Sequence, residues 1–253
     1  MIITFLGTGT SQGVPVIACE CAVCSSVDFR DKRLRTSIHI QIDNKSLVVD
    51  TGPDFRCQML RERINHLDAV LFTHAHKDHT AGLDDVRSYN FKQKYDMPVY
   101  GRHDVLEQLQ QEFSYIFASN KYPGVPRVVL HKIENKPFTV QGIDILPIDV
   151  LHYKLPVFGF RIKDFTYITD VNSISDVEKE KIKGSKVLVL SALQKEDHIS
   201  HFNLYQAIDL INELNIPQAY LIHMSHRLGL HAAIETELPA HINLAYDGLK
   251  IKL

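Results

Sequence analysis

The sequence lacks the features that mark membrane-spanning, fibrous and disordered proteins. Its longest apolar runs, residues 68–73 and 186–190, are far shorter than the ~20 residues that a helix needs to cross a bilayer. The first residues carry neither the basic flank nor the cleavage site of a signal peptide. Repeats, low-complexity stretches and Pro/Gly/Ser-rich linkers are also missing. We therefore expect a cytoplasmic protein that does not contact a membrane and in which residues 1–253 form one domain.

A large excess of charge of either sign is missing as well. Over 253 residues, 28 Lys and Arg and 30 Asp and Glu give a formal net charge of −2, and 45% of the residues are hydrophobic. A chain of this length and composition can bury a full hydrophobic core. Proteins that bind polyanions usually present a basic surface, so we do not expect nucleic acid to be a partner.

Cysteine is scarce, with only four residues. Cys57 lies in an expected helix and is predicted to be a small buried residue. The other three, Cys19, Cys21 and Cys24, lie within six residues of one another. Because a cytosolic chain rarely keeps disulfides, this cluster predicts a metal site. A closed structural zinc site has four ligands, and His226 is the candidate for the fourth.

Short β-branched runs alternate with helix-like segments along the chain, and many of the runs are hydrophobic nearly throughout. Strands of that kind suit sheets that are covered by helices on one side and by a second sheet on the other. The sequence therefore predicts an α/β fold built as one layered domain. The expected strands are residues 2–6, 37–42, 46–50, 69–73, 99–101, 128–131, 143–150, 157–162, 165–169, 187–190 and 219–223. The expected helices are residues 54–64, 79–90, 104–117, 175–183 and 202–215, with a cap at or near Asn203 on the last.

The strongest chemical signal is the segment His74-Ala-His76-Lys-Asp78-His79, which directly follows the apolar strand ending at Thr73. Three imidazoles and one carboxylate within six residues, on a turn and a helix start, can converge on one small volume. Neutral imidazole and carboxylate suit Zn, Mn or Fe, and this mixed set does not choose among them. The segment therefore predicts a metal site at the end of the strand, where α/β folds gather their functional residues.

This H-x-H-x-D-H pattern resembles the hallmark of the metallo-β-lactamase superfamily, whose fold is a four-layer αββα sandwich with the active site at one edge of the paired sheets. The later ligands of that family are a His, an Asp and a His, each at a strand end, and His152, Asp170 and His223 stand in that order. An Asp at the bridging position points to the phosphodiesterase side of the superfamily, because lactamases lack it. The resemblance implies two divalent cations, one held by His74, His76 and His152, the other by Asp78, His79 and His223, with Asp170 bridging them.

The segment Leu47-Val-Val-Asp50-Thr-Gly52 matches the strand-Asp-x-Gly turn of the same superfamily. The resemblance implies that Asp50 orients the histidine loop without touching metal, since a metal-bound imidazole needs a partner on its other nitrogen. The alternative is that Asp50 belongs to a turn that caps the helix expected from Asp54.

Further motifs resemble one subgroup over residues 2–249, the phosphodiesterases of the bacterial phosphonate-degradation pathway. They are the opening Leu6-Gly-Thr-Gly9 with Gln12-Gly-Val-Pro15, the C-x-C-x-x-C cluster and the closing His223-Met-Ser-His226. The resemblance implies a structural zinc on the three clustered cysteines and His226, besides two catalytic Mn or Zn ions. It also implies a small phosphodiester substrate, the 1,2-cyclic phosphate of a ribose that carries a 5-phosphate.

The resemblance also implies a mechanism, in which a hydroxide shared by the two cations attacks the phosphate and a histidine protonates the leaving oxygen. His201, which precedes an expected helix, matches the general-acid histidine of the family, and His198 is its rival. An unperturbed imidazole titrates near pH ~6.5 and can donate a proton at neutral pH. Asp78 and Asp170 are the carboxylates of this catalytic set.

The segment after the histidine motif holds the candidate substrate contacts. Arg87 is a candidate phosphate clamp, because guanidinium binds two oxyanions in parallel. The alternative is that the helix turns Arg87 to solvent or pairs it with Asp84. Residues 84–97 depart from the subgroup and are expected to overhang the site. They carry three aromatic side chains that either stack on a base or pack on the protein, Tyr89, Phe91 and Tyr95.

Four other functions share parts of this pattern. A tRNA 3′-processing endonuclease has the same seven ligands, but the flexible arm and basic surface of that family are missing here and the cysteine cluster is foreign to it. A cofactor-biosynthesis branch binds zinc through cysteines, and a thiolester hydrolase uses two metals but needs no acid such as His201. A catalytically silent metal-binding module would lack ligands, whereas none is missing here. Members of the superfamily are often dimers, so a homodimer is one expected assembly.

Overall fold

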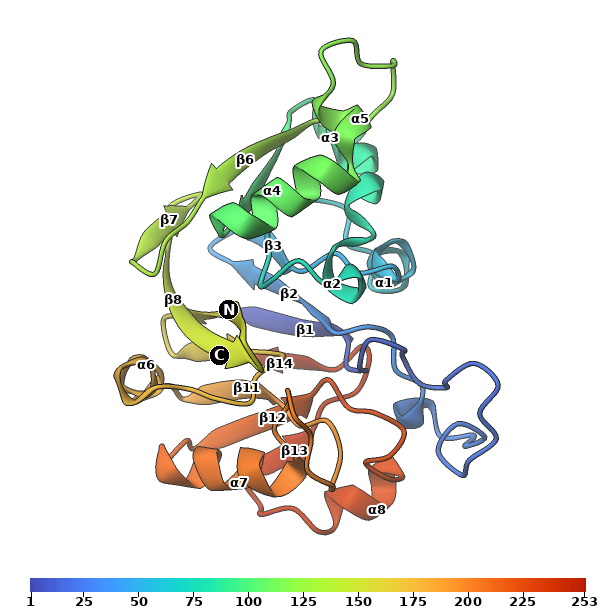
Figure 1. The fold of residues 1–253 in the computed structure, drawn as a ribbon, viewed down its shortest axis with the longest axis vertical. Coiled ribbons are helices and arrows are strands. Elements are labelled where there is room, and N and C mark those ends of the chain that lie inside the picture. The colour runs from blue at the N-terminus through green and yellow to red at the C-terminus, as the bar shows by residue number, and fades with distance from the viewer.

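The computed structural model describes residues 1–253, and its strands form two seven-stranded sheets that pack face to face (Figure 1). Neighbouring strands are parallel from β3 to β6 and from β10 to β13, and antiparallel elsewhere. The first sheet consists, in spatial order, of β14 (Lys250–Lys252), β1 (Ile2–Gly7), β2 (Ser37–Ile42), β3 (Lys45–Val49), β4 (Ala69–Leu71), β5 (Met97–Gly101) and β6 (Val128–Lys132). The second consists of β13 (Ile242–Leu244), β12 (Gln218–Ile222), β11 (Val187–Ser191), β10 (Phe165–Ile168), β9 (Leu155–Ile162), β8 (Ile143–His152) and β7 (Phe138–Val140).

Helices cover the outer face of each sheet. The helices of the first half of the chain lie over the first sheet, and those of the second half lie over the second (Figure 1). The first set is α1 (Phe55–Arg61), α2 (Lys77–Thr80), the 3-10 helix η2 (Leu83–Val86), α3 (Arg87–Gln93), α4 (His103–Glu112) and α5 (Ser114–Phe117). The second set is α6 (Asp176–Ile182), α7 (Leu204–Glu213) and α8 (His231–Glu235), and a further 3-10 helix, η1 (Phe29–Asp31), lies in the N-terminal loop.

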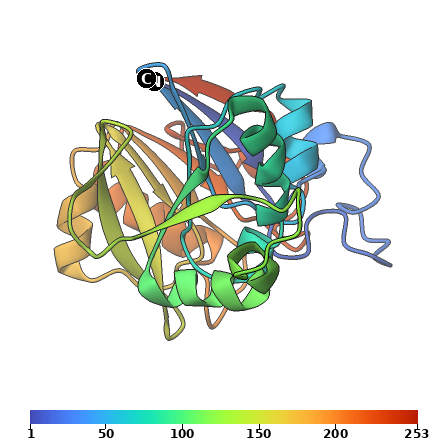
Figure 2. The ribbon, with the colours of Figure 1, turned by 90° about the horizontal axis from the view of Figure 1, so that it is seen from above.

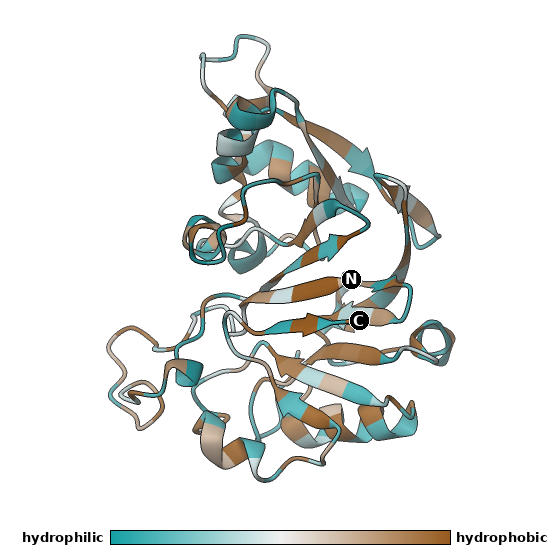
Figure 3. Cartoon of the chain, turned by 180° about the vertical axis from the view of Figure 1, so that it is seen from behind, coloured by the Kyte–Doolittle hydropathy of each residue, from teal (hydrophilic) through white to brown (hydrophobic).

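Three hydrophobic clusters fill the spaces between the four layers. One of 17 buried residues lies between the first sheet and its helices, one of 21 lies between the two sheets, and one of 22 lies between the second sheet and its helices. The strands are hydrophobic along much of their length, whereas the helices alternate hydrophobic and hydrophilic residues (Figure 3). This is the pattern expected when each sheet is buried on both faces and each helix on one. The predicted αββα sandwich is confirmed.

Several boundaries differ from the sequence-based expectation. The helix expected over residues 79–90 is divided into α2, η2 and α3, and the one expected over residues 104–117 is divided into α4 and α5. The short elements β7, β13, β14 and α8 were not expected. Cys57 was predicted to be buried but is exposed, because its neighbours Phe55 and Gln58 occupy the inner face of α1. The cap at Asn203 is confirmed, since this residue forms a capping box with Gln206.

The two ends of the chain meet at the edge of the first sheet (Figure 2). The amino group of Met1 donates a hydrogen bond to the carbonyl of Leu253 (2.9 Å), and β1 pairs with β14. The last residues therefore complete the first sheet even though most of the preceding strands belong to the second. None of the helices combines the length and the apolar character needed to cross a membrane.

Candidate metal centre

The predicted metal ligands stand where strands of both sheets end. The histidine motif follows β4, Asp170 follows β10, and His223 follows β12, while His152 is the last residue of β8. His76 is the residue that precedes the first turn of α2. Since the carboxyl ends of parallel strands lie along the same edge of a sheet, segments far apart in sequence are brought together there.

Three residues that follow strands at this site share an unusual backbone conformation, and one of them is Asp50 after β3. Asp50, Asp170 and His223 have φ angles of 65°, 49° and 57°, in the left-handed region that few residues other than glycine adopt. Asp, Asn and His tolerate this region better than bulky or branched residues do. The left-handed residue turns the chain sharply at the end of the strand. All three residues combine this conformation with a place in or beside the metal-ligand cluster.

Two glycines hold the histidine loop against the turn that carries Asp50. A Cβ atom on Gly52 would lie 2.1 Å from the carbonyl oxygen of Asp78, and one on Gly82 would lie 2.2 Å from the carbonyl oxygen of Gly52. The amide of Gly82 donates to Thr51 (2.8 Å) at this approach. Only glycine permits backbones this close. The same approach explains why the helix expected over residues 79–90 is interrupted near Gly82.

Three imidazoles of the cluster, those of His74, His79 and His152, are oriented through one ring nitrogen each. Nδ1 of His74 lies 2.9 Å from Thr73 Oγ1, and Nδ1 of His79 lies 2.7 Å from Asp50 Oδ2. Nδ1 of His152 donates to the carbonyl of Ser200 (2.7 Å). In each case Nε2 remains free to bind a metal, and the outer partner fixes the ring. The contact predicted for Asp50 is thus present. Thr73 and the carbonyl of Ser200 were not predicted as partners. A single threonine at a strand end forms no distinctive pattern, and a backbone carbonyl leaves no signal in a sequence.

The free nitrogens converge on the carboxylates of Asp78 and Asp170. His79 Nε2 lies 3.1 Å from an oxygen of each carboxylate. His223 Nε2 lies 3.1 Å from the other oxygen of Asp170 and 3.7 Å from Asp78. His74 Nε2 and His76 Nδ1 lie 3.0 Å apart. Asp170 also groups with His74 and with His152 within ligand-atom distances of 4.8 Å, so its carboxylate lies between the two predicted ligand sets.

The cluster satisfies a physical test for bound cations. Nε2 of both His79 and His223 is buried and forms no hydrogen bond, although carboxylate oxygens are near. Buried polar atoms are nearly always paired, and an unpaired one is costly. A divalent cation among these nitrogens and oxygens would pair all of them at once. Imidazole and carboxylate are the ligands that Zn and Mn accept.

The charge state of the cluster also fits metal binding. Burial lowers the pKa of His74, which keeps this ring neutral. Burial raises the pKa of Asp170, but the nearby His223 and His79 more than offset it and hold the pKa well below the usual value. Burial lowers the pKa of His79, yet the three surrounding carboxylates raise it well above the usual value. A proton therefore competes with metal at His79, and metal binding releases it.

His201 lies against this cluster. Its ring centre is 4.4 Å from that of His152 and 4.9 Å from that of His223, and its Nδ1 lies 3.7 Å from Asp170. Burial lowers the pKa of His201 to about 3, so the expectation of an ordinary imidazole pKa is wrong. Its rival His198 is exposed, with its ring centre 5.2 Å from that of His201.

The candidate substrate contacts on residues 84–97 are placed differently from the metal ligands. Arg87 forms an ion pair with Asp84 (3.4 Å), which is the second of the two alternatives that the sequence left open. The hydroxyl of Tyr89 donates to the carbonyl of Ile64 (2.7 Å) and its ring is buried. The hydroxyl of Tyr95 lies within hydrogen-bond distance of two backbone carbonyls, at residues 67 and 68. Tyr89 therefore packs on the protein and the Tyr95 hydroxyl is held by the backbone, whereas the third aromatic side chain, Phe91, is exposed.

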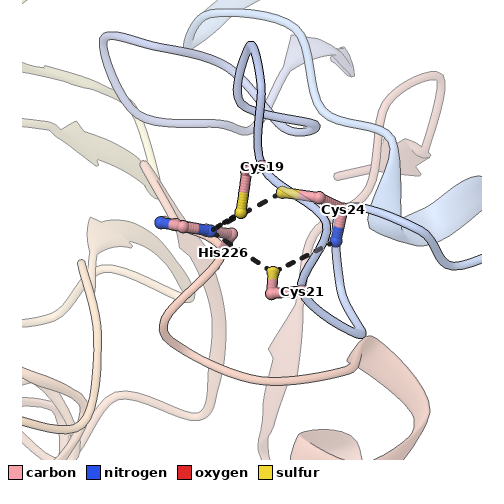
Figure 4. A group of neighbouring side chains, drawn as sticks. All are labelled: Cys19, Cys21, Cys24 and His226. Atoms are coloured by element: carbon pink, nitrogen blue, oxygen red, sulfur yellow. Dashed lines mark hydrogen bonds between the residues drawn. The ribbon is translucent and has the colours of Figure 1, made fainter.

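The cysteine cluster meets His226 as predicted (Figure 4). The Sγ atoms of Cys19, Cys21 and Cys24 lie 3.3, 3.4 and 3.6 Å from His226 Nδ1. Hydrogen bonds from the Cys24 amide and His226 lower the pKa of Cys21 to about 6, whereas burial raises the pKa of Cys24 to about 11. Three sulfurs and one nitrogen around a common centre fit a tetrahedral structural zinc.

Replacing Asp50 with asparagine should lower the affinity of the centre for metal about 10- to 100-fold, because His79 loses the anion that fixes its ring. Asparagine tolerates the left-handed backbone, so the fold should persist. Competition with a chelator measures the affinity. Asp43→Asn is the matched control, because Asp43 is an exposed residue with a φ of 48°. Equal affinities for the two variants would remove Asp50 from the centre.

The chain is similar to a known protein family and to several solved structures. A model of the beta-lactamase superfamily domain matches residues 45–224. A solved structure described as a new diphosphatase from the PhnP family is 38% identical, with a TM-score of 0.93 over 100% of this chain and 97% of that one. The short form of human tRNase Z is 17% identical, with a TM-score of 0.70 over 100% of this chain and 99% of that one.

One relative is about twice as long as this chain. The octanoyltransferase of Porphyromonas gingivalis is 40% identical over 248 residues, which are 97% of this chain and 50% of the relative. The chain thus spans about half the length of this relative. The name octanoyltransferase describes that longer protein, and its activity cannot be assigned to the matched half alone.

Proposed function

The chain belongs to the beta-lactamase superfamily and resembles its PhnP family, and from this premise we propose that it hydrolyses a small phosphodiester at a centre of two divalent cations. The observation that carries the proposal is the convergence of Nε2 of His79 and His223 on the buried carboxylate of Asp170. Nε2 of both histidines is buried without a hydrogen-bond partner, and a bound cation would supply that partner.

Seven residues would hold the two catalytic cations, Zn or Mn. When bound, the cations supply a nucleophile from water at neutral pH and positive charge against the phosphate. The protein supplies the geometry, since His74, His79 and His152 are held through Nδ1 and the two oxygens of Asp170 face His79 and His223. In the proposed assignment one set would be His74, His76 and His152, the other Asp78, His79 and His223, and Asp170 would serve both. The side chains of Asp170, His74 and His79 lie within ligand distance of one another, and Asp170 lies within the same distance of His152.

His201 is placed to give the leaving oxygen its proton. Its ring borders both ligand sets, through His152 on one side and His223 on the other. Burial lowers the pKa of His201 and disfavours the imidazolium. An anionic phosphodiester beside the ring favours the charged form and raises its pKa, so the substrate itself promotes the acid. His201, rather than the exposed His198, is therefore the general acid of the proposed reaction.

The cyclic 1,2-phosphate of a ribose is the substrate that the sequence motifs favour. The diphosphatase of the PhnP family supports a second candidate, a phosphoanhydride, since the same centre attacks phosphorus in either bond. The likeness to tRNase Z is at 17% identity and supports the fold alone. The complete ligand set argues against a catalytically silent module. A zinc on the three clustered cysteines and His226 completes the proposed cofactors.

Replacing His201 with alanine should slow ester hydrolysis in proportion to how poorly the leaving group departs. For 2′,3′-cyclic AMP, which releases an alkoxide, we expect a loss of about 10²- to 10⁴-fold in kcat. For bis(p-nitrophenyl) phosphate, whose leaving group needs little protonation, the loss should stay below about 10-fold.

His198→Ala serves as the control and should change both rates little, because that side chain is exposed. If His201→Ala slows both esters by the same factor, His201 is not the acid. If neither wild-type activity is detected with Zn or Mn, the proposed function itself fails.

A further inference from the structure

A pocket of about 610 Å³ opens beside the histidines of one proposed ligand set. Its volume is in the range of small-molecule sites. None of its lining residues is acidic, and the only one with a permanent charge is a lysine. The proposed mechanism does not use most of this lining. The pocket is bordered by His76, His152, Tyr153, Lys154, Leu155, Ile199 and Ser200.

The wall of this pocket is fixed by side chain to backbone hydrogen bonds. The Asn172 side chain accepts from the amide of Tyr153 (2.7 Å) and donates to the carbonyl of Ile199 (3.0 Å). His152 donates to the carbonyl of Ser200 (2.7 Å). The turn between β8 and β9 is thereby tied to the loop that leads to His201. A wall held at three points is preorganised for a ligand, which lowers the ordering cost of binding.

Tyr153 occupies a position that turn chemistry would give to another residue. It begins the two-residue turn between β8 and β9 with a φ of 58°, where glycine or asparagine is preferred. Its side chain is 50% exposed, so packing does not explain the tyrosine either. The Lys154 ammonium lies 5.3 Å from the centre of the ring. Ile199, also on the wall, is 69% exposed.

We propose that this pocket binds a nucleoside carried by the phosphodiester substrate, with the base stacked on Tyr153 beside Ile199 and a second phosphate paired with Lys154. The inference rests on the proposed function and specifies its substrate class as a nucleotide ester. It replaces the ribose 1,2-cyclic phosphate favoured by the motifs, because that sugar carries phosphate rather than a base on C1. An exposed aromatic ring accepts any base because every base presents a flat face. A lysine without an acidic neighbour in the pocket pairs with phosphate. The pocket adjoins His76 and His152, so the ester bond reaches the metals while the base lies on the ring.

Two chromogenic esters with the same leaving group test the base contact. Thymidine 5′-(p-nitrophenyl phosphate) carries a nucleoside, and methyl p-nitrophenyl phosphate carries none. Wild-type protein should prefer the nucleoside ester at least about 10-fold in kcat/KM, mainly through KM. Tyr153→Asn should bring this ratio close to one, and Tyr153→Phe should keep it. Asparagine suits the left-handed turn, so the melting temperature of Tyr153→Asn should be equal to or above that of the wild type.

A 3′-phosphate on the thymidine ester tests the second contact. It should lower KM further in the wild type by about 10-fold, and Lys154→Gln should remove that gain. Lys163→Gln is the matched control, because Lys163 begins the turn at the other end of β9. A ratio that Tyr153→Asn leaves unchanged, or a 3′-phosphate gain that survives Lys154→Gln, would overturn the corresponding contact.

Calorimetry with thymidine 3′,5′-bisphosphate separates this inference from the proposed function. The wild type should bind this nucleotide at least about 10-fold more tightly than Tyr153→Asn, whether or not either ester is hydrolysed. Absence of ester hydrolysis with preserved, Tyr153-dependent binding would reject the hydrolase while supporting the pocket. Hydrolysis of the methyl ester with equal nucleotide binding by both proteins would reject the pocket alone.

Discussion

Replacing Asp170 with asparagine should reduce hydrolysis of bis(p-nitrophenyl) phosphate at least about 10³-fold, because losing a shared ligand costs more than the 10- to 100-fold of an outer partner. The carboxylate offers one oxygen toward His79 and the other toward His223, each at 3.1 Å. An amide keeps the shape but removes the charge that two cations require. Asparagine also tolerates the φ of 49° at this position.

The same variant should bind fewer catalytic ions, which elemental analysis of the purified protein measures. Asp176→Asn is the control, because that side chain is fully exposed at the start of α6 and should change neither rate nor metal content. Circular dichroism establishes that Asp170→Asn is folded. A folded Asp170→Asn protein with wild-type turnover would exclude Asp170 from the centre.

Replacing Cys24 with serine should release one zinc and lower the melting temperature. The thiol is buried and lies 3.6 Å from His226 Nδ1, so it belongs to the site that joins the N-terminal loop to the segment after His223. A structural metal contributes folding free energy directly. For a chain of this size, a loss of ~3 kcal/mol corresponds to a fall of roughly 6–12 °C.

Cys57→Ser is the matched control for this experiment. Cys57 is exposed and lies outside the cluster, so the melting temperature and the zinc content should stay at the wild-type values. Metal analysis and a thermal melt are carried out on both variants. Retention of the zinc by Cys24→Ser, or equal melting temperatures for the two variants, would reject the structural site.

The layered fold and the metal cluster were predictable from sequence because both depend on strong, local signals. Hydrophobic strands marked both sheets, and ligands at strand ends are brought together by the parallel arrangement of β10 and β12. The grouping of Asp170 with His74 and His79 was expected from the histidine motif, the order of the later residues and the family resemblance. The contact of Asp50 with His79 was also predictable, because Asp50 lies in a strand-Asp-x-Gly turn that the sequence shows.

Other features depended on tertiary contacts that no short pattern reports. The break at Gly82 follows from its approach to the carbonyl of Gly52, which is 30 residues earlier in the chain. The sequence left open whether Tyr89 and Tyr95 stack on a base or pack on the protein, and their hydroxyls donate to backbone carbonyls in the connection that precedes β4. Burial lowers the pKa of His201, and burial cannot be read from its neighbours in sequence.

The proposed substrate pocket could not be predicted from the sequence either. Tyr153 and Lys154 form a two-residue turn with no motif, and Ile199 lies 45 or more residues away. The hydrogen bonds of Asn172 and His152 bring these residues into one wall. Specificity in this fold is therefore expected to depend on turns that vary freely, whereas the ligands are set by the strands.

The most direct test of the metal centre is to add Zn or Mn back to protein from which the catalytic ions have been removed with a chelator. Turnover of bis(p-nitrophenyl) phosphate should be absent from the stripped protein and should rise to a plateau at two equivalents per chain. Turnover that persists after both ions are gone, or that does not return when they are restored, would contradict the account.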